Sequence, residues 1–154
     1  MTTMQDNHFT IVVQMLVWKP IAETFNAFID PSITSKFWFA RSSGPLEAGK
    51  TVNWEWEVNN ISARVNVEEI IDGKLIKLDW GGPIPKLEIE FKTYGDHATL
   101  VIIRNYNEKI MAGKIINEII ENTSDLTSVL DGLKAYLEHN IKLNLIADKV
   151  PHHN

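Results

Sequence analysis

The C-terminal part of the chain carries the clearest helical pattern. Within residues 123–147, the apolar positions recur at steps of three and four residues: Leu126, Val129, Leu130, Leu133, Tyr136, Leu137 and Ile141. This spacing predicts a long helix with one apolar face, capped at its N-terminus by Thr123 or Ser124. Gly132 lies beside that face. Because a glycine costs a helix about 1 kcal/mol relative to alanine, we expect another backbone to approach it closely.

Much of the preceding sequence alternates between apolar and polar residues, which is typical of half-buried strands. Residues 9–17 form the first such stretch, and 52–58 form the most regular one. Asn59-Asn60 and Asp72-Gly73 are residue pairs that favour tight hairpin turns. Residues 99–106 are apolar at both odd and even positions. This composition predicts an interior strand.

Three segments depart from the strand pattern. Residues 20–29 have helical spacing and end at Asp30-Pro31, and a second short helix is expected from Ser32 through the aromatic residues 37–39. Residues 108–121 predict a short or irregular helix that leads into the long one. The order of elements therefore predicts an α+β fold, in which a curved antiparallel sheet wraps around a long C-terminal helix and two short helices follow the first strand.

Composition narrows the range of functions. A length of 154 residues with 44% hydrophobic residues predicts one domain over 1–154, with its core at about 9–147 and polar termini. The net charge is −5 and no Lys/Arg cluster occurs, so nucleic acid is not an expected partner. No segment reaches the roughly 18 apolar residues of a membrane span. There is also no apolar leader and no cysteine, which indicates a cytoplasmic protein.

Three segments carry a resemblance to a known family. The first is residues 20–31, which end in Asp30-Pro31 and are followed by Phe37-Trp38. The second is the loop 44–50, which contains Gly44-Pro45 and Gly49. The third is residues 129–138 of the long helix. In this order and spacing they resemble the START-like superfamily, also called SRPBCC or helix-grip. They are most similar to homologues of the C-terminal domain of the heat-shock chaperone ATPase activator.

The resemblance extends over roughly residues 9–145 and implies the helix-grip fold. That branch often has Gly-Trp at the start of the last helix, where this chain has Asp125-Leu126. The superfamily includes lipid carriers, hormone receptors, polyketide cyclases and co-chaperone domains, so the resemblance leaves the function open.

The tryptophans suggest a binding site. The chain has five of them, and a sheet curved around a single helix tends to leave an apolar gap. We predict a pocket for a small hydrophobic or aromatic ligand, with Met111 to Ile119 as its lid. Ordinary core packing is the alternative explanation for the aromatic residues. The residues expected to line the pocket are Trp38, Trp54, Trp56, Trp80, Met111 and Ile115.

Arg104 would anchor a ligand carboxylate if its side chain pointed into the pocket, although it would equally fit in solvent at a strand end. Glu55 and Glu57 alternate with apolar residues, so we expect them to face solvent rather than to form a catalytic pair. The histidines lack zinc-ligand spacing. We therefore predict no catalytic residue, no metal and no cofactor.

Three functions remain open. The first is binding of a small hydrophobic ligand, a lipid among them. The second is a chaperone-associated interaction domain that acts through its surface, with a role in the stress response. The third, expected less than a binding role, is a cyclase- or hydrolase-like enzyme with Arg104 and Tyr106 in its cavity. The chain would act as a monomer or a homodimer.

Overall fold

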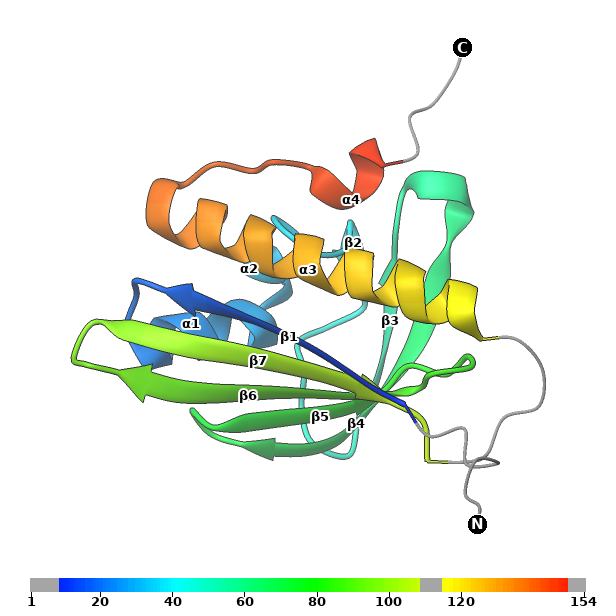
Figure 1. Ribbon diagram of the computed structural model, residues 1–154, viewed down its shortest axis with the longest axis horizontal. Coiled ribbons are helices and arrows are strands. Elements are labelled where there is room, and N and C mark those ends of the chain that lie inside the picture. The colour runs from blue at the N-terminus through cyan, green and yellow to red at the C-terminus, as the bar shows by residue number, and fades with distance from the viewer. Residues whose placement is uncertain (1–8, 109–114, 150–154) are drawn as a thin grey trace.

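The computed structural model describes residues 9–108 and 115–149, and shows a curved antiparallel sheet crossed by one long helix (Figure 1). The seven strands lie in the order β1-β7-β6-β5-β4-β3-β2. They are β1 (Thr10–Val17), β2 (Arg41–Ser42), β3 (Thr51–Glu55), β4 (Ser62–Ile71), β5 (Leu75–Asp79), β6 (Lys86–Tyr94) and β7 (Ala98–Tyr106). The helices of the described part are α1 (Ile21–Ile29), α2 (Pro31–Thr34), α3 (Ile116–His139) and α4 (Leu145–Asp148). The predicted α+β helix-grip fold is confirmed.

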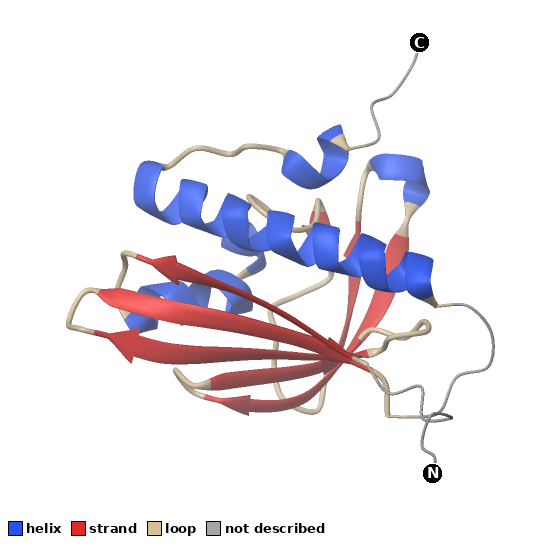
Figure 2. Cartoon of the chain, in the orientation of Figure 1, coloured by secondary structure: helices blue, strands red, loops and turns tan. Residues whose placement is uncertain are grey.

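The sheet has one buried and one outward face, as the alternating sequence predicted. On β6, Leu87, Ile89 and Phe91 are buried in the core, while the residues between them are partly exposed. The apolar strand β7 lies between β1 and β6, antiparallel to both. This position confirms that residues 99–106 form an interior strand. Figure 2 shows the sheet on one side of the molecule and α3 on the opposite side.

The two predicted hairpin turns had different outcomes. At Asp72-Gly73, the chain turns between β4 and β5 with Gly73 at φ 72°, and the Lys74 N–H donates to the Ile71 carbonyl at 2.9 Å. At Asn59-Asn60, Asn60 takes the expected left-handed angle, with φ 53°, but the connection is longer than a two-residue turn. β3 ends at Glu55, and a 3₁₀ helix over Val58–Asn60 makes the connection.

Of the two helices predicted after β1, the first agrees with the structure and the second is shorter than predicted. Asp30 caps α2, because its Oδ1 accepts a hydrogen bond from the Ser32 N–H at 2.9 Å. The second helix was predicted to carry the aromatic residues 37–39, which was wrong because α2 ends at Thr34. The Thr34 hydroxyl donates to the Ala27 carbonyl at 2.6 Å, and the Trp38 N–H donates to the Thr34 carbonyl at 2.9 Å. These bonds close a turn that sends the aromatic residues into the core.

The long helix differs from the prediction at both ends. α3 begins at Ile116, and Thr123 lies inside it with its hydroxyl donating to the Ile119 carbonyl at 2.6 Å rather than capping the N-terminus. Residues 115–131 contain no glycine or proline to interrupt a helix. At the other end, Asn140 adopts a left-handed conformation with φ 56° and its N–H donates to the Tyr136 carbonyl at 2.8 Å. Ile141 therefore lies beyond the helix and is exposed.

The apolar face of α3 packs into the core as predicted. Its buried residues are Leu126, Val129, Leu130, Gly132 and Leu133. Gly132 meets the chain after α2: a Cβ placed on it would lie 3.1 Å from Phe37 Cβ and 3.5 Å from Phe37 Cα. The expected close approach of a second backbone at this glycine is confirmed. None of the helices in the described ranges has the length and apolar content of a membrane span.

Polar contacts hold the C-terminal end of α3 against the edge strand β1. The Lys134 ammonium donates to the Leu16 carbonyl at 2.7 Å and to Glu138 Oε2 at 2.8 Å. The same Glu138 oxygen accepts from the Trp18 N–H at 2.8 Å. The helix thus uses backbone groups at the edge of the sheet that would otherwise be open to solvent.

Candidate functional site

Four of the tryptophans form one aromatic cluster. Trp38 lies at the centre of it, with ring-centroid distances of 4.8 Å to Trp54 and 6.1 Å to Trp80, and Trp54 lies 6.3 Å from Trp56. Trp54 is only 1% exposed and belongs to the same core as the apolar face of α3. The structure therefore brings the predicted tryptophans together, but Trp54 fills the interior as a core residue.

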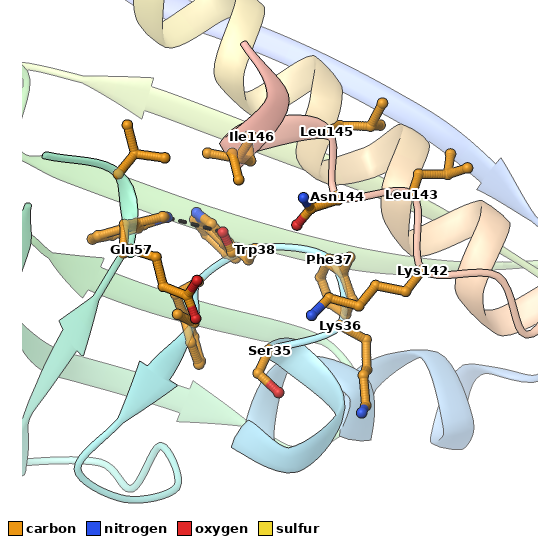
Figure 3. A pocket seen from close by; sticks show the side chains of 16 residues that line it. Ser35, Lys36, Phe37, Trp38, Glu57, Lys142, Leu143, Asn144, Leu145 and Ile146 are labelled. Atoms are coloured by element: carbon orange, nitrogen blue, oxygen red, sulfur yellow. Dashed lines mark hydrogen bonds between the residues drawn. The ribbon is translucent and has the colours of Figure 1, made fainter. Parts of the chain in front are cut away.

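A cleft of about 110 Å³ opens beside this cluster. Residues 35–40 and 56–58 form one side, residues 142–147 form the other, and Gly132 of α3 also lines the cleft. Figure 3 shows Phe37 and Trp38 on one side, facing Ile146 and the residues before it on the other. Trp38 and Trp56 are the predicted site residues that line the cleft.

Hydrogen bonds fix the aromatic side chains near the cleft. The Trp56 indole N–H donates to the Trp38 carbonyl at 2.9 Å, and the Trp80 indole N–H donates to the Ile84 carbonyl at 3.0 Å. Buried or half-buried indoles usually have such a partner. The first bond also accounts for the early end of β3, because Trp56 leaves the strand and its ring crosses to the chain after α2. Backbone carbonyls of neighbouring segments therefore hold both indoles in place.

The roof of the cleft belongs to residues 140–149, which we call the C-terminal strap. It contains two left-handed residues, Asn140 and Asn144, and the short helix α4. Ile146 packs against the core. At the end of the strap, Lys149 Nζ lies 2.8 Å from Ser124 Oγ and 3.0 Å from Asp125 Oδ1. Lys149 therefore attaches the end of the strap to α3, and Ile146 attaches the strap to the core.

Polar groups surround the mouth of the cleft. Lys36 and Lys142 line it, and neither forms an ion pair with another described residue. Figure 3 shows the Lys142 side chain extending from the strap toward residues 35–37, while Glu57 lies on the far side of Trp38. The Asn144 amide also lines the cleft, and its Nδ2 donates to Asp148 Oδ1 at 3.1 Å. In this view, Lys142 and Glu57 therefore lie on opposite sides of Trp38, while the Lys36 side chain points away from the cleft.

The remaining predicted site residues lie elsewhere. Arg104 is on the outward face of β7, where its Nη1 donates to Glu90 Oε1 at 2.9 Å, so the expectation that it points into the pocket was wrong. It alternates with the buried Ile103 and pairs with Glu88 of β6. Ile115 is buried beside the start of α3 but does not line the cleft. Met111 lies outside the described residues, as do residues 112–114 of the predicted lid, while residues 116–119 of the lid belong to α3.

Tyr106 shares this outward face with Arg104. Its hydroxyl donates to Glu88 Oε2 at 2.5 Å. Burial is the main cause that raises the pKa of Tyr106 to about 12, and the hydrogen bond to Glu88 is the second. The two polar residues on which an enzymatic cavity depended therefore lie away from the aromatic cleft.

Carboxylates on the outer face of the sheet are paired with cations. Lys86 Nζ lies 2.7 Å from Glu68, 3.4 Å from Asp79 and 3.6 Å from Glu108. The hydrogen bond to Glu68, together with the attraction of the carboxylates, raises the pKa of Lys86 above its ordinary value despite burial. Within the described ranges, no group of three His, Cys, Asp or Glu residues has the arrangement of a metal site.

The residues of the strap and Lys36 were not recognised from the sequence. The helical spacing continues to Ile141, so residues 140–147 were assigned to the long helix. The signal that would have ended it is the pair Asn140 and Asn144, because asparagine is the non-glycine residue that most readily adopts left-handed angles at a helix end.

Solved structures with the same fold include one with appreciable sequence similarity. The protein SSP2350 from Staphylococcus saprophyticus is 29% identical, with a TM-score of 0.76 over 88% of this chain and 96% of that chain. CalU16 from Micromonospora echinospora is 16% identical, with a TM-score of 0.67 over 89% and 79% of the two chains. The Aha1 dimer from Colwellia psychrerythraea is 15% identical, with a TM-score of 0.69 over 85% and 97%. The last two show the shared fold alone.

A sequence profile identifies the family. No curated protein matches the chain significantly. Residues 19–138, from the end of β1 to the end of α3, match the profile described as Activator of Hsp90 ATPase homolog 1-like protein. The matched region contains the aromatic cluster and the apolar face of α3. This match, together with the fold, shows that the chain belongs to the family of Activator of Hsp90 ATPase homolog 1-like proteins.

Proposed function

We propose that this protein binds a small hydrophobic or aromatic molecule in the cleft beneath the C-terminal strap. The observation that carries the proposal is the wall of Phe37, Trp38 and Trp56, in which the Trp56 indole is held by a hydrogen bond to the Trp38 carbonyl while one side of the cleft stays open to solvent. Flat aromatic side chains beside a few polar groups are typical of small-molecule sites. A ligand ring that replaces water there removes apolar surface from solvent.

The size of the cleft limits the ligand. Drug-sized molecules occupy pockets of roughly 300–1,000 Å³, whereas an apolar cavity of roughly 150 Å³ holds a benzene ring. A cleft of about 110 Å³ with an open mouth therefore suits one ring or a short branched chain. The space between the sheet and α3, where the sequence placed the ligand, is occupied by Trp54 and its neighbours. A lipid chain would bind only if the strap moved away.

The experiment is a titration with single-ring compounds, followed by backbone amide NMR shifts and tryptophan fluorescence. We expect saturable binding with the largest shifts in residues 35–40, 56–58 and 142–147. Trp56→Ala should weaken binding about tenfold or more, because it removes one wall of the cleft. Trp18→Ala is the matched control and should not change the affinity, because Trp18 is 56% exposed and does not line the cleft. Non-saturable shifts, or equal affinities for the two variants, would refute the proposal.

A second candidate function is binding to an Hsp90 chaperone through the surface of α3. Ile116 and Ile120 are 65% and 61% exposed near the start of this helix, and exposed apolar patches often mark binding surfaces. The name of the family supports this partner. The test is stimulation of the ATPase of a purified Hsp90. We expect Ile120→Glu to abolish stimulation and Ile61→Glu, which changes an exposed isoleucine just before β4, to preserve it. An equal effect of both changes, or no stimulation at all, would exclude this function.

A further inference from the structure

We propose that Ile146 sets the largest ligand that the cleft accepts. This inference rests on the proposed function and adds the residue that selects ligands by size. Of residues 140–149, which the structure describes throughout, only Ile146 packs against the hydrophobic core. Figure 3 shows it on the side of the strap that faces Trp38. Ile146 therefore occupies space beside the aromatic wall that a larger ligand would need.

The short helix α4 directs Ile146 inward. Asn144 adopts left-handed angles with φ 59° just before α4, and its carbonyl accepts from the Asp148 N–H at 3.1 Å. The Asn144 side chain also donates to Asp148 Oδ1 at 3.1 Å. Because a helix has about 3.6 residues per turn, consecutive side chains point in different directions. Accordingly, the Leu145 side chain extends away from Trp38 in Figure 3.

The strap is joined to α3 at both ends, which limits the height of the roof. At its start, the Asn140 N–H donates to the Tyr136 carbonyl at 2.8 Å. At its end, Lys149 Nζ lies 3.0 Å from Asp125 Oδ1. A ligand larger than the cleft must therefore press Ile146 into the packed core or lift α4 and expose that side chain to water. Both changes oppose binding.

The volume of the cleft places the size limit near one ring. An apolar cavity of roughly 150 Å³ holds benzene, and this cleft of about 110 Å³ has one side open to solvent. A single ring can therefore lie against Trp38 and Trp56 and extend partly through the mouth. Two fused rings would overlap Ile146. Replacing Ile146 by alanine removes every side-chain carbon beyond Cβ and extends the cleft toward the core.

The test compares benzyl alcohol with 2-naphthalenemethanol, which carry the same hydroxymethyl group on one ring and on two fused rings. Backbone amide NMR shifts report both affinities. We expect the wild-type protein to bind benzyl alcohol about fivefold more tightly, although the larger compound has more apolar surface to bury. Ile146→Ala should bind 2-naphthalenemethanol about tenfold more tightly than the wild type does. Ile146→Phe should weaken binding of both compounds, because the larger side chain fills the cleft.

Ile141→Ala is the matched control. It makes the same chemical change in the same strap, at a position that is 50% exposed and does not line the cleft. Both affinities should stay unchanged in this variant. The amide shifts of residues 142–149 in the free Ile146→Ala protein check that the strap keeps its place. If that variant releases the strap, Ile146→Phe decides, and unchanged affinities in it overturn the inference.

The outcomes separate this inference from the proposed function. If benzyl alcohol binds saturably and the Ile146 variants have the same preference as the wild type, the inference is overturned and the cleft still binds ligands. A wild-type protein that binds 2-naphthalenemethanol more tightly than benzyl alcohol has the same meaning, because Ile146 then sets no limit. If neither compound binds saturably to any of the proteins, the proposed function fails together with the inference.

Discussion

Gly132 shows how a single residue positions the cleft. It lies on the buried face of α3 where that helix comes nearest to Phe37, and no side chain separates the two backbones. Because the contact is so close, the chain after α2 is held against α3 and the aromatic residues 37–39 enter the core. The cost of a glycine within a helix, about 1 kcal/mol, is offset by this packing.

We expect Gly132→Leu to destabilise the protein by about 1–3 kcal/mol, because a larger side chain has to displace Phe37 from a packed interior. Gly132→Ala should be nearly neutral, since its Cβ contact of 3.1 Å is tight but the helix gains propensity. Thermal or urea unfolding measures both. Asp131→Leu, at the neighbouring exposed position, serves as the control and should change stability little. A Gly132→Leu protein as stable as the wild type would show that the contact is not tight in solution.

At the scale of elements, the sheet and α3 are joined by polar contacts as well as by the core. Burial alone would raise the pKa of the Glu138 carboxyl, but the hydrogen bonds from Lys134 and the Trp18 N–H hold that pKa below its ordinary value. Ionised Glu138 therefore stabilises the folded state above the ordinary pKa of 4.5, and this contribution is lost as the pH falls through the lower folded-state pKa.

Glu138→Gln should therefore make the free energy of unfolding less dependent on pH below about 4.5. At neutral pH it should lower stability by about 1.5–3 kcal/mol, the usual value for hydrogen bonds to a charged group. Urea unfolding between pH 3 and 7 measures both effects. Glu23→Gln, which removes an exposed carboxylate of α1 that lies 4.0 Å from Lys19, is the control and should change stability at neutral pH by less than about 1 kcal/mol. A Glu138→Gln protein with the same acid sensitivity as the wild type would argue against a stabilising contact between α3 and β1.

At the scale of the whole molecule, the tryptophans divide between the interior, the cleft and the surface. Trp54 is part of the core that joins the sheet to α3. Trp38 and Trp56 line the cleft, while Trp18 is exposed at the end of β1 and packs edge-on against Tyr94 at a centroid distance of 6.4 Å. One residue type therefore stabilises the fold, forms the candidate site and covers the end of the sheet.

Replacing tryptophans should reveal this division. Trp54→Ala is expected to cost about 3–5 kcal/mol of stability, as large-to-small changes of aromatic core residues do. Trp18→Ala should cost less than about 1 kcal/mol, because more than half of its side chain is already in water. Chemical unfolding monitored by circular dichroism provides the comparison. Similar losses for the two variants would mean that Trp54 is not the packed core residue described above.

The sequence by itself determined the features that arise from local spacing. Alternation assigned most of the strands, the three- and four-residue steps identified the buried face of α3 at Leu126, Val129 and Leu133, and a helical glycine predicted the contact at Gly132. Asp72-Gly73 also marked its turn correctly, because positive φ at glycine is a local property. In each case, the physical cause lies within a few residues of the signal.

The tertiary structure decided the features that depend on neighbouring segments. Residues 99–106 are apolar on both sides, so only pairing with β1 and β6 shows that Arg104 faces outward. The helical spacing at Ile141 could not reveal that Asn140 ends the helix and turns the strap back over the cleft. The alternating pattern continues through Trp56, so it could not show that the strand ends before this residue. The Trp56 indole instead donates a hydrogen bond to the Trp38 carbonyl, in a segment distant in sequence. The candidate site is formed by three segments distant in sequence, and periodicity within one segment holds no information on how separate segments meet.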